Sequence, residues 1–282
     1  MPEFAVKTPP QNTSWSDILD IWRAADEMDV FSEAWNFDHF YPLHPPLDGP
    51  CLEGWTTLAA LAQATTRIRV GSMVNGMHYR HPAVTANMAA SLDIISGGRF
   101  NLGLGAGWFE PESKAYGIPL GSLRERMDRF DEGVEVIHRL LTEETTTFTG
   151  DFYELTDARC EPKPLQQPRP PIVIGGKGEK RTLRTVARFA DYWDAMFHDE
   201  PASWMRLNDI LLEHCRVVGR DQSEIRRSVH IRWGADDDPA KLADEAMRFA
   251  DAGVDVLVFS MRSPQSVSMV EPLADALLSA TS

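Results

Sequence analysis

The chain has 282 residues, of which 43% are hydrophobic, and 42 acidic against 28 basic side chains give it a net charge of −14. This length and apolar content fit either two ordinary domains or one α/β barrel. The acidic balance argues against a general nucleic-acid-binding protein and against one that binds anionic membranes. An anionic cofactor would therefore need local amides and local cations to hold it.

Cysteine usage and the N-terminal segment predict a cytoplasmic protein. Cys51, Cys160 and Cys215 lie far apart and show no C-x-x-C spacing, so neither a disulfide framework nor a cysteine zinc site is indicated. No basic segment followed by an apolar run opens the sequence, and no apolar run approaches membrane-spanning length. We expect a soluble chain with no membrane or nucleic-acid partner.

Short β-branched or aromatic runs alternate with longer amphipathic segments along the whole chain. The predicted strands span residues 3–7, 30–37, 68–74, 99–104, 172–174, 192–196, 228–233 and 254–260. The predicted helices span residues 15–28, 55–64, 81–95, 123–141, 179–189, 202–218, 239–252 and 264–278. Ser14 is the expected N-cap of the first helix, and Pro82 fits the first turn of the third.

Eight strands, each followed by a helix, predict a single (β/α)₈ TIM barrel, an α/β fold, over residues 1–282. No break in composition divides the chain. The segment TTTFTGDFYEL at 145–155 predicts a hairpin around Gly150 and Asp151, within an insertion at about 143–170 that lies outside the βα rhythm.

In such a barrel the residues that follow each strand form the active site. Asp38 and His39 follow the second predicted strand, and histidine is the side chain best suited to exchange protons near neutral pH. A single histidine at a strand end can equally be a structural hydrogen-bonder. No H-E-x-x-H or other ligand spacing is present, so no metal site is predicted.

The stretch IVIGGKGEKR follows the fifth predicted strand and contains Gly175, Gly176, Lys177, Gly178 and Glu179. It nearly fits the G-x-G-x-x-G dinucleotide fingerprint, but it lacks the third glycine and does not follow the first strand, so we reject a Rossmann domain. Its amides and the next helix could bind a phosphate, with Lys177, Lys180 or Arg181 adding charge. The alternative is a tight turn without a ligand.

The fourth predicted strand leads into GAGW, where Gly107 and Trp108 stand at the expected rim of the barrel. Trp108 and Phe109 could form the wall of a planar cofactor site, because aromatic rings offer stacking area with few rotamers to fix. Alternatively, Trp108 plugs the mouth of the barrel.

Five segments taken together resemble the luciferase-like monooxygenase superfamily, and most closely its branch that uses the deazaflavin coenzyme F420. They are NFDHFYP, RIRVGSMV with YRHPA, SGGRFNLGLGAGWFEPE, SLRERMDRFDEGVEVI and PRPPIVIGGKGEKRTLRTVARFADYWD. The resemblance covers about residues 3–262. It specifies the superfamily more strongly than the cofactor, and the cofactor more strongly than the substrate.

The resemblance implies a set of cofactor contacts. Asp38 and His39 would lie against the deazaflavin ring. A non-proline cis peptide would form a bulge behind the ring, at Ser72–Met73. Ser72, Met73, Val74 and Asn75 would contact the cofactor there. Gly107 and Trp108 would hold the ribityl portion, and the turn from Gly175 to Glu179 would hold the phosphate.

Two positions depart from the alcohol and sugar-phosphate dehydrogenases of that branch. Those enzymes carry a motif similar to D-H-F-x-P-W after the second strand. They also carry an acidic residue just after the glycines of the fourth strand. This chain has Leu43 at the tryptophan position and Trp108 at the acidic one. Glu110 and Glu112 are the nearby carboxylates that could substitute for the missing acid.

The leading hypothesis is an oxidoreductase that transfers a hydride between F420 and a small organic substrate. His39 would supply or remove a proton, and Asp38 would orient it or contact the ring. Residues 41–50 and the hairpin near 148–152 would cover the substrate. The alternatives are an FMN-dependent two-component monooxygenase and a non-catalytic flavin or deazaflavin-binding protein. We also expect a homodimer and a separate reductase that supplies reduced cofactor.

Overall fold

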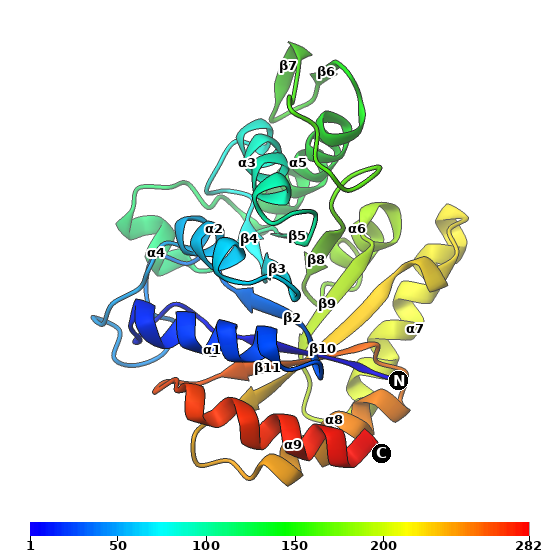
Figure 1. The fold of residues 1–282 in the computed structure, drawn as a ribbon. Helices are drawn as coiled ribbons and strands as arrows, with labels where there is room; N and C mark the ends of the chain where they lie inside the picture. Colours follow the sequence, from blue (N-terminus) through cyan, green and yellow to red (C-terminus); the bar gives the residue numbers. More distant parts are fainter. Residues whose placement is uncertain (282) are drawn as a thin grey trace.

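The computed structural model describes residues 1–281 and contains a closed barrel of eight parallel strands surrounded by helices (Figure 1). Each strand pairs with its neighbours in parallel, and the pairing of β3 with β5 and of β11 with β1 closes the circle. The barrel strands are β1 (Glu3–Lys7), β2 (Phe31–Asn36), β3 (Arg69–Ser72), β5 (Phe100–Gly105), β8 (Ile172–Gly175), β9 (Tyr192–Phe197), β10 (Arg226–Trp233) and β11 (Val256–Met261). The predicted TIM barrel is confirmed.

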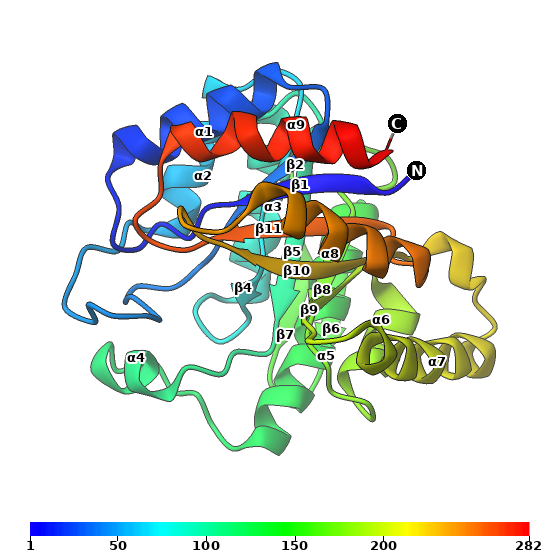
Figure 2. The same ribbon diagram turned by 90° about the horizontal axis from the view of Figure 1, so that it is seen from below.

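A helix covers the barrel after each strand, and Figure 2 shows α1 and α9 running side by side along one flank. The covering helices are α1 (Trp15–Glu27), α2 (Gly54–Ala64), α3 (Pro82–Ile95), α5 (Leu123–Thr142), α6 (Thr182–Phe189), α7 (Pro201–Val218), α8 (Pro239–Asp251) and α9 (Val270–Thr281). Ser14 caps α1 as predicted, in a capping box with Asp17. None of the helices within residues 1–281 is long and apolar enough to cross a membrane.

Further short elements interrupt this rhythm. They are β4 (Asn75–Gly76), α4 (Glu110–Ala115), the antiparallel hairpin of β6 (Thr146–Thr149) and β7 (Glu154–Ala158), and the 3₁₀ turns η1 (Gln222–Glu224) and η2 (Val267–Met269). The hairpin was predicted, but its tip packs on the outside of the barrel, where Glu132 of α5 accepts the amides of Asp151 and Phe152. The hairpin therefore contacts helices and does not cover Asp38 and His39.

Two helices begin later than predicted, and α4 was not predicted at all. Helix α6 begins at Thr182, since residues 176–181 form the connection between β8 and the helix. Helix α9 begins at Val270, after η2, because the segment before it packs on the start of the chain: Gln265 Nε2 donates to the Pro9 carbonyl at 2.7 Å. Helix α4 lies at the end of the barrel toward which the arrows of β2 and β11 point (Figure 1).

Side chains that point into the barrel form a small apolar cluster separate from the larger core between strands and helices. Trp35 is the largest member of this inner cluster and is fully buried. A Cβ atom on Gly71 of β3 would lie 2.3 Å from the Trp35 ring of β2. Strand β3 can therefore pass beside this ring only because it carries glycine at that position. The glycine in RVGS therefore serves the packing of the barrel interior.

Polar side chains occupy the inner positions near the start of the strands. The Glu33 carboxylate is fully buried; it lies 2.8 Å from Arg226 Nη1 and accepts the Trp35 indole N–H at 3.0 Å. Arg226 also lies over the Tyr192 ring and pairs with Glu3 at 2.8 Å. A buried carboxylate needs such partners because it has lost its contact with water.

We expect Arg226→Met to lower the free energy of unfolding by about 3 kcal/mol, because it leaves the Glu33 charge buried without its cation. The matched control is Arg184→Met, which removes an arginine that is half exposed and pairs with Asp131 at 3.1 Å. Loss of that pair should cost less than about 1 kcal/mol. Urea unfolding followed by circular dichroism would measure both, and equal losses would contradict the assigned role of the Glu33 pair.

Candidate functional site

The predicted pair Asp38 and His39 lies at the end of β2, on the rim where the strands finish. Asp38 is fully buried and makes two contacts with Arg80, from Nη1 to Oδ2 at 2.6 Å and from Nη2 to Oδ1 at 2.9 Å. Arg80 Nη2 also lies 2.9 Å from Glu53 Oε1. Burial raises the pKa of Asp38 to about 6, and Arg80 opposes the shift. Asp38 is therefore held by Arg80 and does not orient His39.

His39 is oriented by Glu112, whose Oε2 lies 2.9 Å from His39 Nδ1. Aromatic rings surround the imidazole at its edges, with Phe37 at 5.0 Å, Trp108 at 5.8 Å and Phe109 at 6.0 Å between ring centroids. The His39 side chain is 12% exposed. It is therefore fixed in one orientation and still reaches the open side of the rim.

Glu112 is fully buried and collects donors from two loops. Its carboxylate accepts hydrogen bonds from the Tyr79 hydroxyl, from the Phe40 amide and, at 3.0 Å, from the Tyr41 amide, in addition to His39. Burial raises the pKa of Glu112, but hydrogen bonds from His39, Tyr79 and Phe40 outweigh it and hold the pKa below its ordinary value. The carboxylate is thus ionised across the neutral range.

An ionised carboxylate can only accept hydrogen bonds, so the proton shared with it sits on His39 Nδ1. The second ring nitrogen, Nε2, is then left to accept or donate a proton on the open side of the ring. This arrangement follows the same logic as the carboxylate and histidine of a hydrolase triad, in which the acid fixes the tautomer. The site can hold and move one proton.

The residue that organises this site lies on α4, which periodicity did not reveal. Six residues are too few for a repeating apolar pattern. Pro111, with Glu110 and Glu112 on either side, is the one local feature of the sequence that indicates the start of a helix here. Proline and acidic side chains are both favoured in the first turn of a helix. Of the two carboxylates considered from the sequence, Glu112 reaches His39, whereas Glu110 is exposed.

A non-proline cis peptide is present at Met73–Val74, so the predicted position at Ser72–Met73 was wrong by one bond. The reason is the length of the ladder with β2. Ser72 still pairs with Asn36, and the Met73 amide donates to the Asn36 carbonyl at 3.0 Å. The strand leaves the ladder only after Met73, and it pairs with β5 again from Asn75.

The bulge after β3 contains two buried polar atoms without partners in the described chain. Ser72 Oγ and Asn75 Oδ1 are buried and have no hydrogen-bond partner within residues 1–281. Asn75 is fixed from its other side, because its Nδ2 donates to the Gly103 carbonyl at 2.7 Å. The Val74 side chain fills the space beside β8, where a Cβ atom on Gly175 would lie 2.9 Å from it.

The glycine turn after β8 contains Gly176, Lys177, Gly178 and Glu179, and the amides of residues 177–180 donate to no group in the described part of the chain. The helix does not begin directly after the turn, so its amides are the available donors rather than a helix N-terminus. Lys177 Nζ donates to the Phe197 carbonyl at 2.6 Å.

The charged side chains of Glu179, in this turn, and of Arg181, just after it, form ion pairs with other parts of the protein. Arg181 pairs with Asp128 at 2.8 Å and with Asp131 at 2.7 Å, both on α5. Glu179 Oε1 lies 3.0 Å from Arg206 Nη1. The expectation that Arg181 adds free positive charge to a phosphate site is therefore wrong, because two carboxylates already neutralise it.

Gly107 and Trp108 lie between β5 and α4. The Gly107 carbonyl accepts a hydrogen bond from Arg126 Nη1 at 3.0 Å, and its φ of 86° is one that glycine adopts without strain. Trp108 is 60% exposed, so it does not plug the barrel. Its indole contacts the edge of His39 and the Phe109 ring, which leaves most of its surface open.

Three titratable side chains that the sequence did not single out are buried beside the turn. Lys7 ends β1, and His230 Nε2 lies 3.0 Å from Asp194 Oδ1. Burial lowers the pKa of Lys7 to about 8, with Asp194 opposing the shift, and burial also lowers the pKa of His230. A Cβ atom on Gly175 would lie 3.3 Å from Asp194 Oδ2, so this cluster borders the turn. Because Lys7 is the last residue of a predicted strand, its position at the rim could have been expected from the sequence.

No group of three or more His, Cys, Asp or Glu side chains in residues 1–281 is arranged to hold a metal ion. The rim carries three notable features: the His39–Glu112 pair, the bulge after β3 and the glycine turn. These three features come from segments far apart in the sequence and meet at the same end of the barrel.

Comparisons with known proteins identify relatives with two kinds of oxidoreductase name. The chain is 30% identical over 246 residues to a 4-hydroxyprotoasukamycin monooxygenase of Streptomyces nodosus subsp. asukaensis. The matched region covers 82% of this chain and 64% of that protein. It is 31% identical over 247 residues to an F420-dependent hydroxymycolic acid dehydrogenase of Mycobacterium tuberculosis, with coverage of 85% and 65%. The chain thus spans slightly less than two thirds of each of these relatives.

A solved structure has the same fold. An F420-dependent secondary alcohol dehydrogenase, in complex with an F420-acetone adduct, matches with a TM-score of 0.88 at 18% identity and covers 99% of each chain. The family model described as luciferase-like monooxygenase matches residues 2–275. This match covers nearly the whole sequence and agrees with the barrel. The chain therefore belongs to the luciferase-like monooxygenase family.

Proposed function

We propose that this protein transfers a hydride between the deazaflavin coenzyme F420 and a small organic substrate. The observation that carries the proposal is the His39–Glu112 pair on the rim, which fixes the tautomer of a histidine beside the bulge and the glycine turn. A hydride transfer to or from an organic substrate needs one group that moves a proton. Relatives named as F420-dependent enzymes support this choice.

The residues present fit such a cofactor. Ser72 Oγ and Asn75 Oδ1 are buried without partners in the described chain, and a deazaflavin ring carries both donors and acceptors on its polar edge. The free amides of residues 177–180 suit a phosphate. Val74 fills the space between the bulge and Gly175, where it would support the ring from behind.

When bound, F420 supplies the hydride chemistry, and the protein's own residues supply orientation and proton transfer. His39 Nε2 gives or takes the proton, and Glu112 stabilises the imidazolium that forms when His39 is protonated. Asp38, the residue before His39, is buried and held by Arg80. The Phe40 and Tyr41 rings lie 4.9 Å and 5.5 Å from the ring of Tyr116, the residue that follows α4, so the loop after β2 would exclude water from the site.

The second candidate is an FMN-dependent monooxygenase that receives reduced flavin from a separate reductase. It is favoured by the 30% identity to a relative named as a monooxygenase. The same phosphate amides and the same His39–Glu112 pair would serve FMN. A homodimer, the separate reductase and a cytoplasmic location stay predictions.

Titration of the purified protein with F420, FMN and FAD, followed by fluorescence, tests the cofactor. We expect F420 to bind at least about tenfold more tightly than FMN, a difference of about 1.4 kcal/mol. Tight binding of FMN without binding of F420 would reject the proposal in favour of the second candidate. Oxidation of reduced F420 that depends on an added organic substrate would exclude a non-catalytic binding protein.

We expect Glu112→Gln to reduce turnover about 100-fold with little change in cofactor affinity, because glutamine keeps the shape but loses the charge that holds His39. Glu27→Gln removes an exposed carboxylate at the far end of α1 and serves as the matched control.

A double-mutant cycle separates positioning from general stabilisation. In a His39→Ala background, Glu112→Gln should have almost no further effect on turnover, because Glu112 acts through His39. Two losses that multiply would mean that Glu112 has a role independent of His39.

A further inference from the structure

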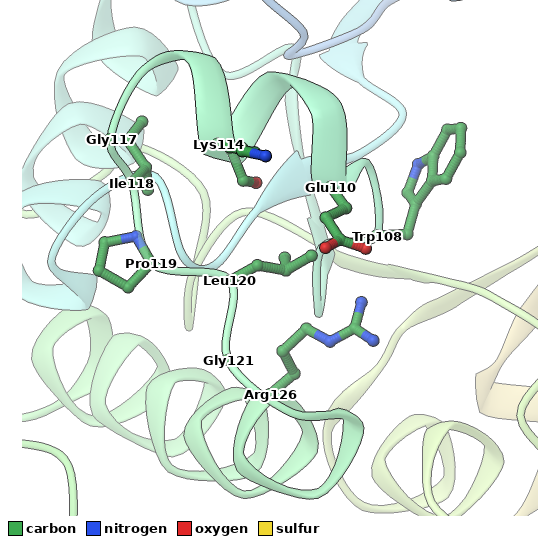
Figure 3. A pocket seen from close by; sticks show the side chains of 10 residues that line it. Trp108, Glu110, Lys114, Gly117, Ile118, Pro119, Leu120, Gly121 and Arg126 are labelled. Carbon is green, nitrogen blue, oxygen red and sulfur yellow. The ribbon is translucent and has the colours of Figure 1, made fainter.

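A cleft of about 440 Å³ opens on the outer side of α4, next to the proposed cofactor site. It lies between α4, the segment that follows it and the first turn of α5 (Figure 3). Its lining consists of Trp108, Glu110, Ser113, Lys114, Gly117, Ile118, Pro119, Leu120, Gly121 and Arg126. Trp108 borders His39, and Arg126 donates to the Gly107 carbonyl, whereas the other lining residues take no part in the site described above.

Positive side chains without carboxylate partners gather at this cleft. Lys114 and Arg126 line it, and Arg129 reaches its wall, with Nη1 at 3.5 Å from the Pro119 carbonyl. Within residues 1–281, none of the three forms an ion pair with a carboxylate, and Arg126 Nε is buried without a partner. Such a cluster is notable in a chain with a net charge of −14.

Neighbouring arginines behave differently. Arg124, on the same turn of α5 as Arg126, lies 3.7 Å from Asp128, and Arg184 pairs with Asp131 at 3.1 Å. The cations of the cleft thus keep their charge without a carboxylate partner, although Arg126 and Arg129 each donate to a backbone carbonyl. Glu110 adds one negative charge, and Figure 3 shows Glu110 and Arg126 extending toward the same space.

The cleft is connected to the cofactor site by the beginning of α5. Arg126 holds the Gly107 carbonyl, and two residues further on Asp128 holds Arg181, which follows the glycine turn. Arg181, Asp128 and Arg126 thus link the end of the glycine turn to the cleft along the first two turns of α5. Trp108 stands at the border between the two sites.

We propose that this cleft binds the anionic tail of F420, a deepening that rests on the proposed function. Beyond its phosphate, F420 continues through a lactyl group into a chain of γ-linked glutamates, whereas FMN ends at its phosphate. A flexible chain of carboxylates suits a shallow cleft with several unpaired cations and no deep pocket. The cleft would thereby distinguish F420 from FMN at a distance from the ring.

Fluorescence titration with forms of F420 that differ only in tail length tests this assignment. We expect F420 with several glutamates to bind the wild-type protein about five- to tenfold more tightly than the form without glutamates at low ionic strength. The difference should shrink in 0.5 M NaCl, because salt screens exposed charges.

Removing a positive charge and removing a negative charge from the cleft should change the affinity for the long-tailed form in opposite directions. Lys114→Gln should weaken binding of the long-tailed form about threefold and leave the form without glutamates unchanged. Glu110→Gln should strengthen binding of the long-tailed form. Lys241→Gln, an exposed lysine on α8, is the matched control and should change neither.

The outcomes separate this inference from the proposed function. Failure of both forms of F420 to bind would overturn the proposed function. Equal affinity for both forms, or equal effects of Lys114→Gln on both, would overturn the tail site and leave the proposed function standing.

Discussion

The site depends on the burial of one carboxylate, that of Glu112. A carboxylate without water must be surrounded by donors, and here they come from the loop after β2, through His39, Phe40 and Tyr41, and from Tyr79 beyond β3. Helix α4 is therefore tied to two other segments of the rim. The same contacts that satisfy the charge also orient His39, so the stability of this corner and its chemistry have one cause.

Other buried charges in the barrel are satisfied in the same way, by a partner of opposite sign. Arg80 holds Asp38, Arg226 holds Glu33, and His230 lies beside Asp194. Polar atoms left without partners within residues 1–281 include those of Ser72 and Asn75 at the bulge. Unpartnered buried atoms occur elsewhere as well, and those of Ser72 and Asn75 are the ones that lie at the bulge of the proposed cofactor site.

The relatives of this chain include enzymes named for F420 and enzymes named as monooxygenases, and the barrel fold alone does not determine which activity a chain has. The distinction must come from side chains. In this chain the acid expected directly after the glycines of the fourth barrel strand is replaced by Trp108, and Glu112, four residues later, reaches the histidine from the side of α4. In this chain the carboxylate that contacts the histidine therefore comes from α4.

The sequence by itself determined the eight strands and their helices, because strand and helix periods are local properties, and it placed Asp38 and His39 at a strand end. It did not reveal α4, which is shorter than two helical turns, or the Met73–Val74 cis bond, whose position depends on how far the ladder with Asn36 extends. Only the tertiary structure decided that Glu112, 73 residues from His39, is its partner and that Arg181 is already neutralised by α5. Contacts at such separation depend on how the chain closes into a barrel, and no local pattern records them.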